Sequence, residues 1–497
     1  MKKHIIILAL GLFSLTSQSQ GIENALLYAQ DNLNGTARFS AMSGAFGAVG
    51  GDFSAINVNP AGAAIFANNQ AGITLSNFNI KNNSDYFGTK NSENRNSFSL
   101  NQAGGIFVFN NTNSKSDWKK FTLAVNYENS NNLDNSLISI GTNPNNSVAN
   151  YFTSVANSIN VPVSTLENYY YEELTLREQI AFLGYQGYLI NLNPTNPNDN
   201  SYISNIDAGN FYQDSFIESN GYNGKVAFNA AAQYKDRFYF GLNVNTHFTD
   251  YRKVSNFYEE NDNSANGLRQ LYFDTDLHTY GNGFSMQMGA IAKVTKSFRA
   301  GLSYQSPTWY TLTDELLQTI STTGFSGSTT NPNSDPDSNV LVTYEPYKLK
   351  TPGKWTGSLA YVFGKKGLLS VDYAVKDYSS TKYRPNDNFF RPTNLAMKNS
   401  LTLANELRIG GEYRIRQWSL RGGYVNEQSP YKNSKTIGDL TGFSGGFGYN
   451  FGNTKLDMSY SHSQRKTQQG FFEQGFTDGP TINSQNNTIS MSLLFEL

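Results

Sequence analysis

Apolar and polar residues alternate along most of this sequence beyond residue 70. Within 237–249, for example, Phe238 and Phe240 alternate with Tyr239 and Gly241. Alternation with a period of two over about ten residues is typical of strands in transmembrane barrels. About fourteen such segments are predicted, at 71–80, 98–109, 118–129, 222–234, 237–249, 284–295, 298–310, 353–363, 367–378, 404–415, 418–427, 441–452, 454–465 and 486–497.

The connectors between these segments alternate between short and long. The short ones follow the even-numbered segments and cover 235–236, 296–297, 364–366, 416–417 and 452–453, with 110–117 somewhat longer. The long ones follow the odd-numbered segments and cover 81–97, 130–221, 250–283, 311–352, 379–403, 428–440 and 466–485. Outer-membrane barrels have short turns on one rim and long external loops on the other. A soluble sandwich has no reason to sort its loops in this way, so the pattern predicts an all-β transmembrane antiparallel β-barrel.

The apolar residues of each predicted strand fall on one face. In the last segment, Ile489, Met491 and Leu493 share a face, and Ser490 and Ser492 lie on the other. The apolar face is expected to meet lipid, because nothing else in so polar a chain could cover it. Phenylalanine and tyrosine near the strand ends fit the aromatic girdles of a membrane protein.

The longest connector, 130–221, contains a helical pattern. Residues 164–183 have N-cap residues at their start, early carboxylates, and apolar positions three or four apart. These features predict one external helix within an otherwise Asn-rich loop. The helix could receive an apolar substrate, or it could cover the barrel or contact a neighbouring protein.

Composition and the N-terminus narrow the class of protein. The chain of 497 residues has a net charge of −1 and no cysteine, so disulfides, thiolate metal sites and nucleic-acid binding are not expected. Two lysines precede the apolar run 5–15, which predicts a signal peptide over 1–19 and a mature chain from Gln20. No later run approaches the roughly 18 apolar residues of a membrane helix. A secreted β-protein and an outer-membrane barrel both remain compatible with these features.

The segment before the first predicted strand is rich in glycine and alanine. It covers 44–66 and contains the motif Asn59, Pro60, Ala61 and Gly62. Glycine and alanine let backbones approach closely, and Asn-Pro interrupts regular structure. A compact plug with tight turns is therefore expected. A Gly-rich surface loop ahead of an ordinary β-domain is the alternative for this segment taken alone.

This segment resembles the N-terminal hatch of the FadL/TodX family of outer-membrane transporters for hydrophobic compounds. In that family a Gly-rich segment leads to an Asn-Pro-Ala motif just before the first barrel strand. The stretches 300–307, 407–413 and 445–449 are also similar to strands of the family. The resemblance covers roughly 35–80 and most of 284–497, whereas 81–283 is similar in architecture alone.

The resemblance implies a domain organisation, a location and a function. A hatch over 20–70 would lie inside a barrel formed by 71–497, in the outer membrane of a Gram-negative bacterium. The function would be the uptake of hydrophobic compounds such as long-chain fatty acids, through a hatch-gated pocket and a lateral route into the bilayer. A hydrophobic molecule gains little from a water-filled pore, so an apolar pocket is expected.

Charged residues are predicted inside the barrel. A two-residue turn at 416–417 would place Glu412 across from Arg421 on the inward face, with Arg408 and Arg414 on the same face. Opposite charges on adjacent strands stabilise a sheet by roughly 0.2–1 kcal/mol. These residues could pair for structural reasons, hold the hatch, or meet a carboxylate headgroup of a substrate.

The sequence does not predict an enzyme. Of the four histidines, His247 is the one predicted to face the lumen, and its neighbours Asn243 and Asn245 are not obvious catalytic partners. His278 is expected in a polar loop. No metal site and no cofactor are expected.

Two other functions remain open from the sequence. A barrel of this kind could serve as a subunit or docking partner of an outer-membrane secretion or assembly complex, with 130–221 as its binding surface. A soluble all-β binding protein would be released without detergent. The expected partners are outer-membrane lipid, a hydrophobic small molecule and, in the docking alternative, an outer-membrane protein.

Overall fold

The computed structural model describes residues 21–195, 199–262, 268–324, 334–336, 338–387 and 389–497. The predicted signal peptide over 1–19 lies outside the described residues. No helix among the described residues has both the length and the apolar character needed to cross a membrane.

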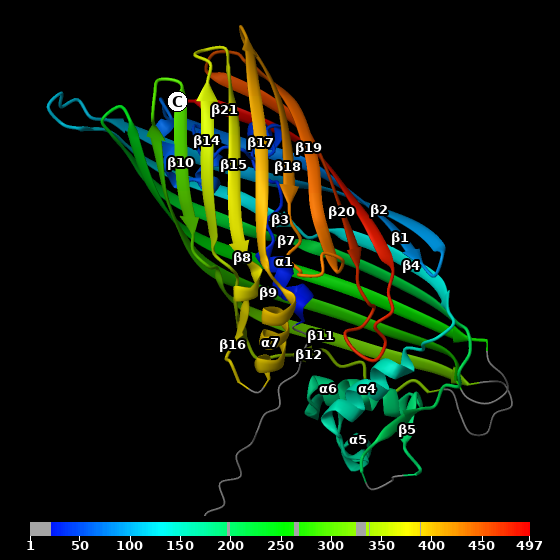
Figure 1. Cartoon of the computed structure of the whole chain (residues 1–497). Coiled ribbons are helices and arrows are strands. Elements are labelled where there is room, and N and C mark those ends of the chain that lie inside the picture. The colour runs from blue at the N-terminus through cyan, green and yellow to red at the C-terminus, as the bar shows by residue number, and fades with distance from the viewer. Residues whose placement is uncertain (1–20, 196–198, 263–267, 325–333, 337, 388) are drawn as a thin grey trace, which may run out of the picture.

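Within this part of the chain, fourteen antiparallel strands close into a ring (Figure 1). Each strand pairs with the next one along the ring, and β1 pairs with β21 to complete it. The fold class and all fourteen predicted segments are thereby confirmed. In ring order the strands are β1 (Gln70–Tyr86), β2 (Thr89–Asn110), β3 (Trp118–Asn132), β7 (Phe211–Tyr234), β8 (Phe238–Asn261), β9 (Leu268–Lys293), β10 (Phe298–Gln305), β14 (Lys354–Val362), β15 (Gly367–Asp377), β17 (Leu403–Ile415), β18 (Trp418–Glu427), β19 (Ile437–Asn450), β20 (Thr454–Gln468) and β21 (Thr481–Glu496).

Further strands extend the wall beyond the ring. β4 (Asn135–Asn143) continues β3 and pairs with β7, and β11 (Trp309–Gly324) continues β10 and pairs with β9. The remaining short strands are β12 (Val342–Thr343), β13 (Tyr347–Lys350) and β16 (Lys382–Arg384), with β5 (Ile190–Leu192) and β6 (Tyr202–Ser204) forming a separate two-stranded sheet.

Burial alternates along the strands as the sequence predicts. On β8, Phe238 and Phe240 are exposed on the outer face, and Tyr239, Asn243 and Asn245 are buried on the inner face. A β-strand turns successive side chains to opposite faces, so one face covers the lumen and the other is left for lipid.

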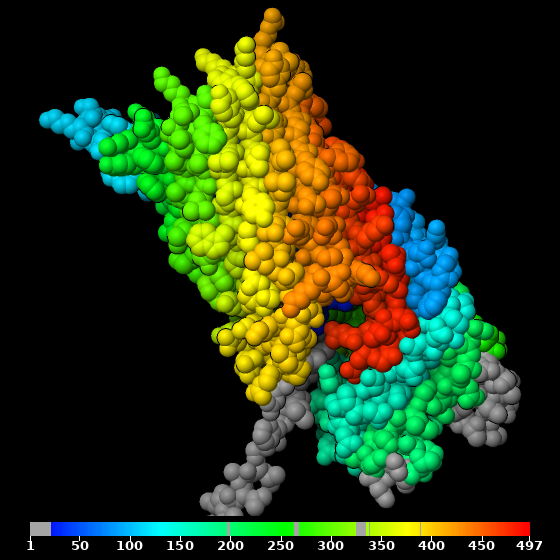
Figure 2. Space-filling view, in the orientation of Figure 1, coloured from blue at the N-terminus to red at the C-terminus, as the bar shows by residue number. Residues whose placement is uncertain are grey.

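The short connectors lie together at the end of the barrel that carries the C-terminus, uppermost in Figure 1. The turns 363–366, 416–417 and 451–453 each separate two strands of a hairpin there. Figure 2 shows the opposite end hollowed between the red segment near residue 470 and the yellow-to-orange segment around α7, with blue N-terminal residues inside.

Two predicted long loops are wrong, because the strands continue through them. β1 and β2 are separated by Phe87 and Gly88 alone, so most of 81–97 is strand. Most of 250–283 likewise belongs to β8 and β9, which pair from Phe238 to Glu260. His278 accordingly lies on β9 rather than in a loop. The extensions of β1 and β2 are almost entirely polar, so a hydropathy pattern gives no signal for them. Those of β8 and β9 bury apolar residues such as Leu271 and Phe273.

The predicted single helix over 164–183 is also wrong. Two helices, α5 (Val163–Asn168) and α6 (Leu176–Gln186), are separated by the short 3₁₀ helix η2 (Tyr171–Glu173), and α4 (Ala149–Ile159) precedes them. Thr175 and Glu178 form a capping box that starts a new helix at Leu176. The capping box therefore begins a second helix within the stretch 164–183, whose apolar spacing predicts a single continuous helix.

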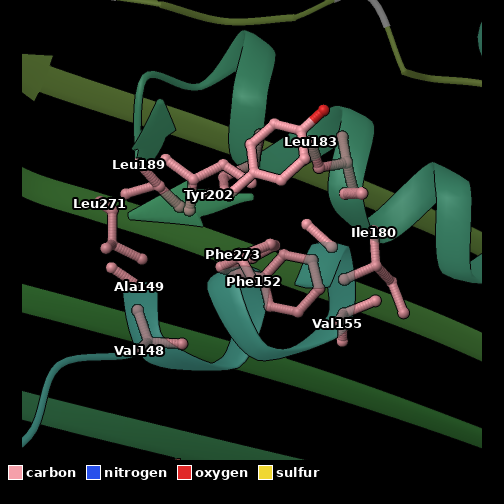
Figure 3. Close-up of a cluster of buried hydrophobic side chains, with 14 of the residues drawn as sticks. Val148, Ala149, Phe152, Val155, Ile180, Leu183, Leu189, Tyr202, Leu271 and Phe273 are labelled. Carbon is pink, nitrogen blue, oxygen red and sulfur yellow. The ribbon is translucent and has the colours of Figure 1, made fainter. Parts of the chain in front are cut away.

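Residues 146–208, which we call the external module, pack onto the barrel end through an apolar cluster. Phe152, Leu183 and Tyr202 of the module are buried against Leu271 and Phe273 of β9 (Figure 3). This contact fixes the module on the wall of the barrel instead of leaving it as a free loop.

The N-terminal residues lie inside the ring, where the blue segment of Figure 1 is seen between the strands. They form α1 (Ile22–Ala29), α2 (Ala37–Ala41), α3 (Ala55–Val58) and the 3₁₀ helix η1 (Pro60–Ile65). α1 packs in an apolar cluster that includes Tyr383, Phe390 and Met397, around η3 (Tyr378–Ser380) and α7 (Phe390–Ser400). We call residues 21–66 the inner segment.

Candidate functional site

Inward-facing glycines of the wall mark where the inner segment touches it. A Cβ at Gly289 on β9 would lie 2.0 Å from Asn59 Oδ1, and one at Gly410 on β17 would lie 2.6 Å from Met42 O. Both distances are too short for a carbon atom, so a larger residue at either position would force the inner segment away. Glycine at these two positions leaves the space that the backbone and side chains of the inner segment occupy.

Asn59 ties the inner segment to the wall and to itself. Its Nδ2 donates to Gly47 O at 2.8 Å and to Ala290 O on β9 at 3.2 Å. Its Oδ1 accepts from Ala61 N at 3.1 Å and caps η1. The Asn59 amide thus provides hydrogen-bond partners for three backbone groups. The inner segment needs such partners because it is not part of the β-sheet.

The next three residues of the motif, 60–62, also lie in contact with the wall or with the inner segment. Asn229 on β7 donates to Pro60 O at 3.1 Å, and Ala61 is fully buried. Gly51 N donates to Gly62 O at 3.1 Å, where two stretches of the inner segment approach each other closely. The structure gives these residues a contact role, and their role as a functional motif stays a prediction.

Glu412 is the centre of a buried ionic cluster. It pairs with Arg421 at 2.7 Å, as the two-residue turn predicts, and with Arg414 at 2.5 Å. It also pairs with Arg38 of the inner segment at 2.9 Å, and Arg421 reaches Asp457 at 2.6 Å. The Glu412 side chain has no exposed area. The cluster therefore anchors the inner segment electrostatically to β17 and β18.

Arg408 belongs to a second cluster, so the structure separates it from the other three predicted residues. It pairs with Glu406, which also binds Lys354 at 2.8 Å. Asp31 of the inner segment pairs with Lys376 at 3.1 Å and with Lys354 at 3.7 Å. Asp31 was not predicted from the sequence, because nothing near it in the chain indicates a role in ion pairing.

We predict that Glu412→Gln loosens the inner segment. Removing one partner of a buried pair leaves uncompensated charge and costs about 3 kcal/mol. Here Arg38 would lose its carboxylate partner at 2.9 Å. The expected result is faster proteolysis within 21–66 and a raised ion conductance in planar bilayers. Glu218→Gln is the matched control, because its pair with Arg95 is half exposed. Unchanged conductance and detergent permeability would assign the cluster to wall stability alone.

The cavity beside the inner segment is polar, so it is not the apolar pocket that the sequence leads us to expect. It has a volume of about 70 Å³, and its lining includes Asp31, Glu128, Lys225, Glu406 and Arg408. Charged groups in this place hold the inner segment. The lumen at this level is therefore a poor site for a purely apolar molecule.

A second cavity of about 210 Å³ lies at the mouth, between the inner segment, the external module and the β20–β21 connector. Its apolar lining consists of Tyr151, Val155, Ile180, Phe471 and Phe472, and its charged lining consists of Glu23, Arg177, Lys253 and Glu473.

The mouth cavity combines stacked rings with charge. Tyr151 and Phe472 stack with centroids 4.5 Å apart. The surrounding protein raises the pKa of the Glu23 carboxyl to about 7, because desolvation outweighs the attraction of Lys253 and the nearby Glu473 repels it. The arrangement suits a molecule with an apolar body and a polar end.

The wall is interrupted between β2 and β3. The two strands pair from Gln102 to Asn110, whereas residues 89–100 of β2 pair with β1 alone within the described chain. We call this gap in the backbone ladder the seam. Side chains bridge it: Asn132 Nδ2 donates to Ser97 Oγ at 2.8 Å. Side-chain bridges separate more easily than a continuous ladder, so the wall can open more readily along the seam than along a fully paired boundary between two strands.

The inner segment holds the β3 edge of the seam. Asn34 Nδ2 donates to Asn129 O at 2.7 Å, and Asn131 Nδ2 donates to Leu27 O at 3.3 Å. A shift of the inner segment would remove these bonds at the edge of the seam. Asn129 and Asn131 of β3 thus link the inner segment in the lumen to the wall.

His247 lies in the lumen as predicted, buried against β9 and β11. Its Nε2 lies 2.8 Å from Ser285 Oγ, and its Nδ1 lies 3.4 Å from Tyr310 Oη. A catalytic triad requires a carboxylate at the second nitrogen, and a tyrosine occupies that place. No group of three or more His, Cys, Asp or Glu in the described ranges is placed to hold a metal ion.

Solved structures with the same fold are known. A FadL homologue of Pseudomonas aeruginosa has 13% identity and a TM-score of 0.51, over 94% of this chain and 99% of that one. The toluene transporters TbuX of Ralstonia pickettii and TodX of Pseudomonas putida have 16% and 12% identity and TM-scores of 0.50 and 0.51, over 94% of this chain and 100% of each. No family model and no curated protein matches the sequence.

At these identities the likeness establishes the fold, and it confirms the resemblance to FadL and TodX at that level. A FadL-like barrel is typical of Gram-negative outer-membrane proteins.

Proposed function

We propose that the protein is an outer-membrane transporter for the uptake of hydrophobic compounds, with residues 20–70 as its hatch. The observation that carries this proposal is the seam, because the inner segment that fills the lumen also binds the β3 edge of the interrupted wall. A plug coupled to a side opening offers a molecule a way into the bilayer that avoids water.

The proposed route begins at the mouth cavity. An apolar molecule binds among Tyr151, Phe471 and Phe472, close to the N-terminal end of α1. Displacement of the inner segment then releases Asn129 and Asn131 and opens the seam. Because the cavity beside the inner segment is charged, the apolar part of the substrate is expected to leave sideways rather than pass through it.

Long-chain fatty acids are the substrate class we propose within the hydrophobic compounds. Arg177 and Lys253 line the mouth cavity beside its aromatic residues and can attract a carboxylate. Glu23 and Glu473 share the cavity and disfavour an anion when ionised. A fatty acid would therefore bind more tightly at a pH below the Glu23 pKa of about 7 than above it.

A docking role in an outer-membrane complex is the second candidate. The external module presents Tyr169 and Tyr170 with 55% and 73% of their surface exposed. Exposed aromatic pairs of this kind are frequent in protein interfaces. The module is large enough and firmly enough packed to present them to a partner.

Purification in gentle detergent separates the two candidates. The transport proposal predicts a copurified lipid or fatty acid, detected by mass spectrometry, and saturable binding of a labelled long-chain fatty acid. Tyr151→Ala combined with Phe472→Ala should weaken that binding about tenfold through lost apolar contact. Tyr169→Ala combined with Tyr170→Ala is the matched control. A stoichiometric protein partner without bound lipid would favour the docking role.

A further inference from the structure

The near-neutral net charge of the chain conceals a separation of charge between the two ends of the barrel. The six short-turn segments 110–120, 235–237, 293–299, 363–366, 414–417 and 451–455 contain thirteen lysines and arginines and two aspartates. The seven ranges predicted from the sequence as long connectors, which lie toward the opposite end whether they form loops or strand extensions, contain sixteen basic and twenty-six acidic residues. We call the short-turn end the cationic rim.

Exposed aromatic residues stand beside the turns of this rim. Trp118, Phe238, Phe363, Trp418 and Phe451 are each exposed by between 42% and 65% of their surface. Aromatic side chains on the outer surface of a barrel lie at the depth of the lipid headgroups. The neighbouring cations are therefore at the level of phosphate groups rather than in bulk water.

Most of these cations have no carboxylate partner. Lys235 pairs with Asp117 at 3.9 Å, and Arg414 and Lys455 pair with acidic residues of the strands. The other ten basic residues make no ion pair with the described residues, although Lys120 and Arg299 turn inward and donate to backbone carbonyls of the inner segment. Arg237, Lys296, Lys365 and Lys366 are also exposed, on three turns that follow one another round the ring.

We propose that the cationic rim binds anionic phospholipid headgroups of the leaflet that surrounds it. The cations are spread over every turn of the rim, and a bilayer surrounds the barrel in the same way. An acidic protein would contact only one side of the rim, or the opening at its centre, and would not need cations on every turn. Basic residues close to a membrane surface each contribute attraction to anionic lipid that salt screens. This binding is independent of what the barrel transports.

Energy transfer to labelled lipid tests the proposal on the full-length protein. Trp118 and Trp418 lie at the rim and can donate to dansyl-labelled phosphatidylglycerol or dansyl-labelled phosphatidylcholine in vesicles. The wild type should prefer phosphatidylglycerol, and added salt should weaken the preference. In the variant Arg237→Gln, Lys296→Gln, Lys365→Gln and Lys366→Gln the preference should fall about three- to tenfold.

The matched control removes four exposed lysines from the opposite end: Lys382→Gln, Lys398→Gln, Lys432→Gln and Lys435→Gln. It should retain the preference. Equal transfer to both lipids in the wild type would overturn the proposal without recourse to any variant. An equal loss in the control would also overturn it, as would a wild type that ignores lipid charge but binds an acidic peptide at the rim.

Discussion

Joining β2 to β3 across the seam is expected to stop uptake. The variant Ser97→Cys with Asn132→Cys places two thiols where the native side chains are 2.8 Å apart. The chain has no cysteine, so no other thiol competes. A disulfide or a short thiol cross-linker at this position would hold the wall closed. Uptake of a labelled fatty acid should then fall roughly tenfold or more, because a blocked conformational step limits the whole cycle.

The control for this experiment is a cross-link on a continuous part of the wall. Thr441 and Gln464 face each other on β19 and β20, and Thr441→Cys with Gln464→Cys should leave uptake unchanged. Reductant should restore uptake in the seam variant. Full uptake by the cross-linked seam variant would contradict the lateral route and direct attention to a path through the inner segment.

Removal of the inner segment should convert a closed barrel into an ion-conducting one. Deletion of 21–60 removes α1, α2 and α3, which occupy the lumen. A barrel of fourteen strands is too wide for its own side chains to fill, so water would enter. Single-channel conductance is expected to rise by about an order of magnitude or more over the intact protein.

The comparison for this deletion is a barrel that loses the external module instead. Replacement of 149–205 by a short Gly-Ser linker shortens the chain at the mouth but leaves Arg38, Asn59 and their wall partners in place. That variant should remain closed. If the deletion of 21–60 also remains closed, the inner segment does not seal the lumen.

The strand positions could be predicted from the sequence because each depends on neighbouring residues. Alternation places Phe238 outside and Asn243 inside whatever the rest of the chain does. A short turn also fixes the register of its own hairpin, and so Glu412 was correctly placed across from Arg421. Local rules failed where polarity does not alternate, as in the extended hairpin of β1 and β2.

The contacts of the inner segment could not be predicted, because closure of the ring creates them. Arg38 and Glu412 are separated by 374 positions, and nothing local to either one indicates the other. The separation of Arg408 from the Glu412 cluster depends on where Asp31 and Glu406 lie within the lumen.

The sequence by itself determined a fourteen-stranded barrel with sorted loops and a lipid-facing side, since a period of two and short turns act over a few residues. The tertiary structure alone decided that the cavity beside the inner segment is charged, that the seam lies between β2 and β3, and that the external module packs on β9. Each of these depends on side chains from distant strands meeting across the lumen or the wall, where chain order carries no information about distance.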